Sequence, residues 1–251
     1  MTTVAQVKRV TRPLLKRNPD LALVGRLVVI KPVHHLLRGI FIGRTPDPIV
    51  FDPAWIANFL FKPVPSYIAP WAEIWGDRLV ATRRVQPDFT KLSVFRARAR
   101  IMVAQMTLPI HERRYPKSWG EWEANDPTIA AKMCKVIEQE ALPMLRGLRS
   151  IEDFVAFAAD KTRFPRTHLE GNCREAPFVY AAQGDIAAAL ATCTRLATQR
   201  PDAPIVKELL PLLRDGDRPG VAKLLHVWEA AAVKRLKLER YWEPTPFPIE
   251  L

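Results

Sequence analysis

The sequence predicts an α+β fold: an antiparallel sheet flanked by helices in the N-terminal part, followed by a C-terminal part that is entirely helical. Three observations favour this class. Short apolar runs rich in Val, Leu and Ile lie within residues 21–61, helix-type patterns with capping residues occupy residues 126–251, and 23 prolines against 10 glycines keep the elements short. Hydrophobic residues make up 48% of the chain, which is enough for a packed core.

The first expected element is a helix within residues 1–17. Val7, Val10 and Leu14 recur at helical spacing and form an apolar stripe of the kind that a helix packs against a core. The same segment carries five basic residues and no acidic residue, a pattern that is also typical of organelle-targeting and membrane-contacting segments. Pro13 and the absence of serine favour the ordinary helix.

Two apolar runs then predict two strands. Residues 21–30 are expected to form a buried strand that stops before Pro32, and residues 33–42 a second strand that ends at Gly43. Because only a short connection separates them, the two strands are expected to pair as antiparallel neighbours. Segments within residues 49–110 fit both strand and helix, and both alternatives stay open.

Capping residues mark the first two helices of the C-terminal part. Asp126 is expected to cap a helix that begins at Pro127, and Pro143 is the only break in the apolar stripe of that helix. Ser150 and Asp153 resemble a capping box, with aspartate in place of the usual glutamate, and predict the start of the next helix.

A helix hairpin is expected over residues 177–198. Gly184 can end its first helix and Asp185 can cap its second. No second copy is predicted at a 34-residue spacing, so a solenoid of repeats is not expected. The last helix is predicted over residues 219–242, and the proline-rich tail after it, residues 243–251, is expected to lie along the surface rather than to act as a docking peptide.

Charge divides the chain into two parts. Residues 1–116 carry 19 basic and 7 acidic residues, while the remainder carries 19 of each, so the formal charge of +12 belongs to the first part. With the change of pattern near residue 125, this predicts a basic α+β part over residues 1–125 and a helical part over residues 126–251, packed together as one compact unit. A summed positive field attracts anionic partners.

The cysteine count indicates a reducing compartment. Cys134, Cys173 and Cys193 are odd in number and widely spaced, which predicts free thiols rather than a disulfide framework. The start of the chain has no signal-peptide pattern, and no apolar run reaches the length of a membrane span. The expected location is therefore the cytoplasm.

Two histidine-containing groups are candidates for chemistry. His34 and His35 are adjacent, and on a strand adjacent side chains point to opposite faces, so they are not expected to share a metal or a substrate. His168 and Cys173 lie in one polar loop and offer the residue types of a thiolate and its base. No known local signature surrounds Cys173, and catalysis there is not the favoured interpretation.

Neither catalytic residues nor cofactor or metal ligands are predicted. The chain lacks the glycine-rich, zinc-hydrolase and serine-hydrolase motifs that specify those chemistries. Paired acids near helix starts and turns are expected to cap helices and offset their dipoles. These acids are Glu121 and Glu123, Glu152 and Asp153, and Asp215 and Asp217.

One row of basic residues is a candidate binding patch. Arg96, Arg98 and Arg100 alternate with alanines, and on a strand their guanidinium groups would share one face about 6.5 to 7 Å apart, near the spacing of successive phosphates. Three further residues are candidates to extend the same patch: Arg83, Arg84 and Lys91. A solvated basic face paired with acids of the other part is the structural alternative.

The order of these features resembles a group of bacterial proteins classed as domains of unknown function, some of them encoded near toxin and immunity loci. The residues that carry the resemblance are 27–42 (LVVIKPVHHLLRGIFI), 118–122 (SWGEW), 140–143 (EALP) and 150–153 (SIED), within a span of residues 1–160. The resemblance implies helices on one side of an antiparallel sheet and action by binding rather than by catalysis.

Three classes of function follow from these observations. The leading hypothesis is a non-enzymatic binding protein that recognises a protein partner, as an immunity protein or an adaptor does. The second is binding of nucleic acid or another polyanion through the basic N-terminal part. The third is an enzyme that uses His168 and Cys173 or acids of the proline-rich region. The oligomeric state is not predicted.

Overall fold

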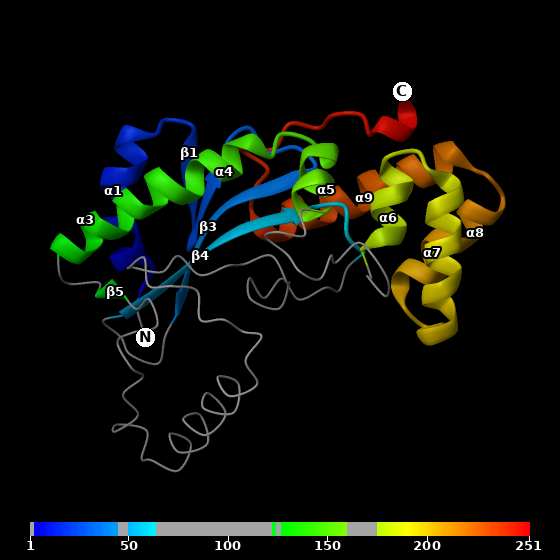
Figure 1. The fold of residues 1–251 in the computed structure, drawn as a ribbon, viewed down its shortest axis with the longest axis horizontal. Coiled ribbons are helices and arrows are strands. Elements are labelled where there is room, and N and C mark those ends of the chain that lie inside the picture. The colour runs from blue at the N-terminus through cyan, green and yellow to red at the C-terminus, as the bar shows by residue number, and fades with distance from the viewer. Residues whose placement is uncertain (1–2, 45–49, 64–121, 124–126, 160–174) are drawn as a thin grey trace, which may run out of the picture.

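The computed structural model describes residues 3–44, 50–63, 122–123, 127–159 and 175–251. It confirms the α+β class, with an antiparallel sheet in the N-terminal part and helices in the C-terminal part. Figure 1 shows the sheet between two sets of helices, with α3 and α4 on the near side and α9 behind it. Among the described residues, no helix has the length and apolar character needed to cross a membrane.

The first helix, α1, spans Val4–Arg17. It begins with a reciprocal capping box, in which Thr3 Oγ1 accepts from the Gln6 amide at 3.2 Å and Gln6 Oε1 accepts from the Thr3 amide at 2.7 Å. Val7, Val10 and Leu14 are buried, so the predicted apolar stripe is confirmed.

The single strand expected over residues 21–30 is wrong, because this run folds into a hairpin of β1 (Leu21–Val24) and β2 (Leu27–Ile30). Gly25 takes a positive φ of 63°, which lets the chain reverse within two residues. Its neighbour Arg26 is buried and donates to the Ile42 carbonyl at 3.0 Å. Because apolar residues lie on both sides of the turn, the sequence of residues 21–30 resembles one continuous strand.

The described strands form one sheet in the order β1-β2-β3-β4-β5, with every neighbour antiparallel. Strand β3 (Leu36–Arg44) begins three residues after the predicted start and pairs with β2, so the predicted antiparallel pairing is confirmed. The first of the segments that fitted both strand and helix forms strand β4 (Val50–Phe59). Strand β5 (Trp122–Glu123) is a short edge.

Both faces of the sheet are buried. One side of β2 and β3, including Val28, Ile40 and Ile42, belongs to the main apolar cluster with α1 and the helices from α3 to α8. The other side, including Val29 and Leu37, packs against the end of α9. Helices therefore cover both faces, in contrast to the one-sided layer that the family resemblance implied.

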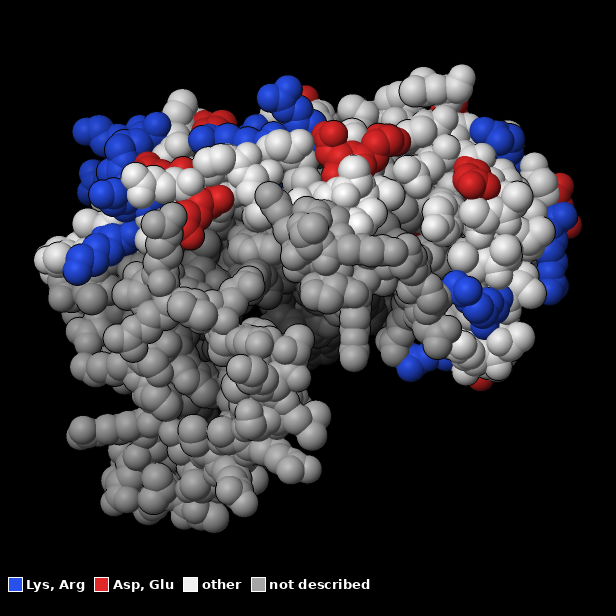
Figure 2. Space-filling view, viewed as in Figure 1, with Lys and Arg blue, Asp and Glu red and all other residues white. Residues whose placement is uncertain are grey.

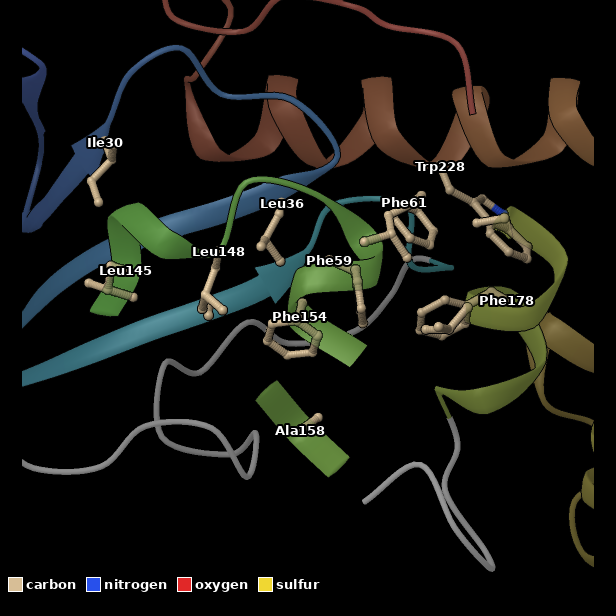
Figure 3. Packing of buried hydrophobic residues seen from close by; sticks show 14 of the residues in the cluster. Ile30, Leu36, Phe59, Phe61, Leu145, Leu148, Phe154, Ala158, Phe178 and Trp228 are labelled. Carbon is tan, nitrogen blue, oxygen red and sulfur yellow. The ribbon is translucent and has the colours of Figure 1, made fainter. Parts of the chain in front are cut away.

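Aromatic rings join the sheet to the C-terminal helices in the main cluster. Phe59 of β4 meets Phe154 with ring centroids 4.6 Å apart, and Phe61 meets Phe178 edge to face at 5.8 Å. Figure 3 shows these four rings side by side, where the end of β4 meets α5 and α6.

The helix expected from Pro127 is confirmed but contains a wider turn. It comprises α3 (Pro127–Val136), a π-helical turn η3 (Ile137–Ala141) and α4 (Leu142–Gly147). Pro143 falls in the first turn of α4, where its missing N–H costs least. The preceding π turn takes up the disruption that a proline brings to a continuous helix.

The capping box at Ser150 is also confirmed. Helix α5 (Ile151–Ala159) follows it, and the Ser150 amide donates to Asp153 Oδ2 at 3.0 Å while the Asp153 amide donates to Ser150 Oγ at 3.1 Å. The same Asp153 carboxylate oxygen also accepts from the amide of Arg149 at 2.8 Å.

The predicted helix hairpin is present, and a second hairpin that the sequence analysis missed follows it. The first consists of α6 (Ala176–Ala182) and α7 (Ile186–Gln199), and the second of α8 (Pro204–Arg214) and α9 (Arg218–Leu236). The sequence expectation concerned a copy at a 34-residue spacing and a solenoid, and two hairpins alone do not make a solenoid.

The two hairpins share one turn design at an offset of 32 residues. Gly184 and Gly216 both have a positive φ, at 82° and 66°. Asp185 then accepts from the Ala188 amide and Asp217 from the Gly220 amide, each at 2.9 Å. This offset differs from the 34 residues considered in the sequence analysis. Prolines within the second hairpin also interrupt its apolar pattern, which made the hairpin difficult to recognise.

Helix α9 ends six residues before the predicted position 242. Lys237 adopts a left-handed conformation with φ 58° and closes the helix in the place where glycine is usual. The chain then turns back towards the sheet, and Trp242 forms a parallel bridge with Val33. A short 3₁₀ turn, η4 (Pro248–Glu250), ends the chain.

Substitution of Gly39 by alanine tests the close approach of β2 and β3. A Cβ on Gly39 would collide with the Val28 carbonyl, and both strands are buried, so Gly39→Ala is expected to destabilise the protein by about 1–3 kcal/mol. Gly147→Ala is the matched control, because no atom lies within 4 Å of the added Cβ there. Urea unfolding of both variants gives the comparison, and equal stability would contradict the packing described here.

Candidate functional site

Most sequence-predicted site residues lie outside the residues that the structure describes. This holds for the whole basic patch and for the candidate thiolate and base: Arg83, Arg84, Lys91, Arg96, Arg98, Arg100, His168 and Cys173. The basic patch and the catalytic alternative therefore stay predictions.

The two described cysteines are buried free thiols. Burial raises the pKa of Cys134, and it raises the pKa of Cys193 to about 11. Because the thiolate is the reactive form, neither side chain is suited to nucleophilic chemistry at neutral pH.

The paired acids within the described residues behave largely as helix caps. Asp153 and Asp217 both cap helices, as expected. Asp215 ends α8, and Glu152 lies exposed in the first turn of α5. The helix dipole favours the carboxylates of Glu152, Asp153 and Asp217 at helix N-termini, but it does not favour Asp215 at the C-terminal end of α8.

The assignment of His34 and His35 to a strand is wrong, and the expectation that they do not share a metal or a substrate stays a prediction. They precede β3 rather than lying on a strand, and both contact the C-terminal tail. His34 Nδ1 lies 3.0 Å from the Glu243 carbonyl oxygen, and His35 Nε2 lies 3.2 Å from that of Pro246. Sequence spacing could not indicate this, because the partners are about 200 residues away.

His35 belongs to a group of four side chains that we term the His–Glu cluster: His35, His226, Glu229 and Glu250. Glu229 has no exposed surface, and its Oε1 lies 3.0 Å from His35 Nδ1. Its Oε2 accepts no hydrogen bond and lies 3.8 Å from His226 Nδ1. The other nitrogen of His226, Nε2, lies 2.9 Å from Glu250 Oε2.

Glu250 connects this cluster to the backbone of the tail. Its carboxylate accepts from the Phe247 amide at 2.6 Å as well as facing His226. Burial opposes ionisation of Glu250, but the Phe247 amide and the His226 ring outweigh it and leave the pKa below its ordinary value.

A second candidate lies on α1. Its exposed side bears all five basic residues of the helix and no carboxylate, and we term this surface the α1 cationic face: Lys8, Arg9, Arg12, Lys16 and Arg17. Figure 2 shows Lys and Arg side chains gathered at the end of the molecule where α1 lies. In the part of the chain that the structure describes, no carboxylate pairs with Lys8, Arg12 or Lys16.

Some basic residues of the N-terminal part, including Arg17 of the α1 cationic face, pair with carboxylates of the helical part. Arg17 donates twice to Glu138, at 2.9 and 3.0 Å, and Lys62 pairs with Glu175 at 2.7 Å. These pairs reduce the positive charge that the described residues of the N-terminal part present to a partner.

No three His, Cys, Asp or Glu side chains within the described ranges are placed to hold a metal ion. Comparison of the chain with protein-family models, with curated proteins and with solved structures finds no match. The site must therefore be interpreted from its own geometry.

Glu138 provides a test of the contact between α1 and the helical part. Hydrogen bonds from Arg17 lower the pKa of Glu138, and Asn18 adds a further bond at 2.8 Å. A carboxyl with a lowered folded-state pKa stabilises the fold above its unfolded pKa, and this contribution is lost as pH falls through the folded value. Glu138→Gln is therefore expected to reduce the loss of stability between about pH 5 and pH 3.

Urea midpoints at several pH values measure this effect. Glu140→Gln on the same helix turn is the matched control, since Glu140 is exposed, and it should retain the wild-type pH dependence. An identical pH dependence in both variants would contradict a stabilising Arg17–Glu138 contact.

Proposed function

We propose that this chain is a non-enzymatic binding protein that recognises an acidic protein partner through the α1 cationic face. The supporting observation is that Lys8, Arg12 and Lys16 are exposed on one side of α1 without a carboxylate partner in the described residues. A surface of this kind speeds encounter with an anionic partner and fixes its orientation.

The row of cations is held in a fixed arrangement. Residues four apart on a helix share a face and are separated by a rise of about 6 Å, so Lys8, Arg12 and Lys16 span about 12 Å. The opposite side of α1 is anchored by Val7 and Leu14, which have no exposed surface. A partner would therefore meet preorganised charges rather than a mobile tail.

Helix stability does not account for these charges. Lys16 and Arg17 interact favourably with the C-terminal end of the helix dipole, but Lys8 and Arg12 lie outside that last turn. Like charges four residues apart destabilise a helix by about 0.2–0.5 kcal/mol per pair. The presence of these charges therefore supports a role in binding a partner rather than in stabilising the helix.

Nucleic-acid binding is the second candidate, and the spacing of the row favours it. Cations about 6 Å apart come close to the spacing of phosphates along a strand. Against it, the large exposed apolar side chains of the described residues are Val4, Val227 and Leu251, none of which offers a ring for stacking on bases. A single row of this length would also contact few phosphates.

The proposal includes a cytoplasmic location in a bacterium. Buried free thiols at Cys134 and Cys193 support a reducing compartment. The enzyme alternative relies on residues such as His168 and Cys173, which lie outside the described residues, so no geometry supports it.

Replacement of Lys8, Arg12 and Lys16 together by glutamine tests the proposed function. Binding of a glutamate-rich protein fragment, measured by calorimetry at low salt, is expected to weaken at least about tenfold, because three contacts of about 0.5 kcal/mol each are lost. Folding should not suffer, since the substitutions remove like-charge repulsion.

The control is the triple replacement of Lys223, Lys234 and Lys237 by glutamine, which removes the same charge from two exposed positions of α9 and from the exposed residue that caps its C-terminal end. The control variant should bind the fragment as the wild type does. Equal loss of binding in both variants would show that net charge alone accounts for the effect. Nucleic-acid binding would be favoured instead if the protein binds a DNA duplex tightly, with a slope of log K against log salt concentration of about −3. The α1 replacements should then abolish that binding.

A further inference from the structure

Arg38 is a charged side chain on a face of the sheet that is otherwise part of the core. It lies on β3 two residues from both Leu36 and Ile40, so it shares their face of the sheet. Figure 3 shows Leu36 on this face together with Leu145 and Leu148 from the end of α4. Only 7% of Arg38 is exposed. A guanidinium therefore occupies a position whose neighbours on the strand are apolar.

No carboxylate of the described residues neutralises Arg38. Its Nη2 donates to the Pro32 carbonyl at 3.2 Å, and no aspartate or glutamate in the described ranges lies within salt-bridge distance of its guanidinium. A guanidinium carries five N–H donors, so one carbonyl leaves most of its hydrogen-bonding capacity unused. Burial of a charge is costly unless a counter-charge and hydrogen bonds compensate for it. The described residues supply little of that compensation.

Two nitrogens of Arg38 remain accessible to a ligand. Nε and Nη1 make no hydrogen bond within the described residues, and neither is among the described nitrogen atoms that are enclosed without a partner. Pro32, whose carbonyl accepts from Nη2, is itself exposed. The guanidinium is therefore mostly buried but within reach of a small ligand from solvent.

The charged groups around Arg38 carry a net positive charge. Burial lowers the pKa of Arg38 and the nearby Arg149 lowers it further, while Asp153 and Asp20 act in the opposite direction. Arg146 joins the group through its ion pair with Asp20. Three guanidinium groups and two carboxylates leave one positive charge in excess.

Both carboxylates are already engaged by other groups. Asp20 accepts from Nε and Nη2 of Arg146, each at 2.9 Å. Asp153 Oδ2 accepts from the backbone amide of Arg149 at 2.8 Å and from that of the next residue at 3.0 Å. Arg146 is thus paired on both of these nitrogens, whereas Arg38 and the exposed Arg149 have no carboxylate of their own among the described residues.

Fold stability does not account for a guanidinium at position 38. Replacement of a buried charge by a well-packed apolar side chain is often neutral or stabilising, and the flanking Leu36 and Ile40 show that the position borders the core. The bond to Pro32 adds little, because water can satisfy the carbonyl of an exposed residue. A ligand that supplies the counter-charge explains the presence of arginine.

We propose that Arg38 and Arg149 form a binding site for a small oxyanion, a phosphate or a carboxylate group, with Arg38 at its base and Arg149 at its rim. The N–H groups of Arg38 that do not contact Pro32 donate to the oxyanion, in charge-assisted hydrogen bonds that are short and strong. Arg149 is exposed, so its side chain is able to turn towards the bound group. The inference is independent of the proposed function, because the site shares no residue with the α1 cationic face.

Titration of the full chain with inorganic phosphate at constant ionic strength tests the site by nuclear magnetic resonance. The Nε–Hε resonance of Arg38 and the amide resonances of residues 148–150 are expected to shift together and to saturate, with a Kd of about 1 mM or lower. A parallel titration with acetate identifies the group that is recognised: tighter binding of phosphate indicates a phosphorylated ligand, and tighter binding of acetate a carboxylate. Absence of a saturable shift with both anions would overturn the proposal.

Methionine variants test the two arginines separately. Arg38→Met is expected to weaken phosphate binding more than about tenfold, because hydrogen bonds to a charged group are lost. Arg149→Met should weaken it about threefold, since this charge lies at the rim and is screened by water. Arg195→Met is the matched control, because it removes an exposed arginine of α7, and it should bind phosphate as the wild type does.

Urea unfolding distinguishes anion binding from a structural role of Arg38. In phosphate-free buffer, Arg38→Met should unfold at the wild-type urea concentration or above it, because the variant removes a buried charge that lacks a counter-charge. Phosphate should raise the urea midpoint of the wild type but not that of the variant. A lowered midpoint in phosphate-free buffer together with an undiminished response to phosphate would show that Arg38 is structural. Should Arg38→Met not fold, equal phosphate binding by Arg149→Met and Arg195→Met would still contradict the proposed site.

Discussion

Burial of both faces of the sheet is the constraint on which the rest of the structure depends. Strands β3 and β4 pair over nine residues, from Leu36 with Phe59 to Arg44 with Phe51, and they lie at the centre of the molecule. A sheet that is apolar on both sides needs two helical covers. The chain supplies α1 and α3–α5 for one side and the end of α9 for the other, so the N-terminal part cannot complete its core without the last helix.

Because the sheet and its helical covers share one core, ion pairs form between residues that are far apart in the sequence. Ion pairs join Arg17 to Glu138, Asp20 to Arg146 and Lys62 to Glu175, each across more than 100 residues. The tail that follows α9 then returns to the entry of β3 and brings the His–Glu cluster together. Among the described residues of α1, Lys8, Arg12 and Lys16 remain exposed without a carboxylate partner and are available to a partner protein.

Local patterns in the sequence predicted the local structure well, and distant contacts escaped them. Capping residues such as Ser150 and Asp185 act on amides three residues away, so they mark helix starts directly. The turn at Gly25 was missed because apolar residues on both sides are buried, which removes the alternation that usually marks a hairpin. His35 was assigned to a strand because nothing near it indicates Glu229, 194 residues away. The basic residues of α1 were visible in the sequence, but only the fold shows that Lys8, Arg12 and Lys16 have no carboxylate partner among the described residues.

Native-state hydrogen exchange tests most directly whether the sheet and its two helical covers form one cooperative unit. The account predicts that amides of β3 and of the second half of α9 open only by global unfolding, with free energies equal within about 1 kcal/mol. Exchange from α9 at a free energy lower by more than about 2 kcal/mol, with β3 still protected, would contradict it. The sheet would then be stable without its second cover.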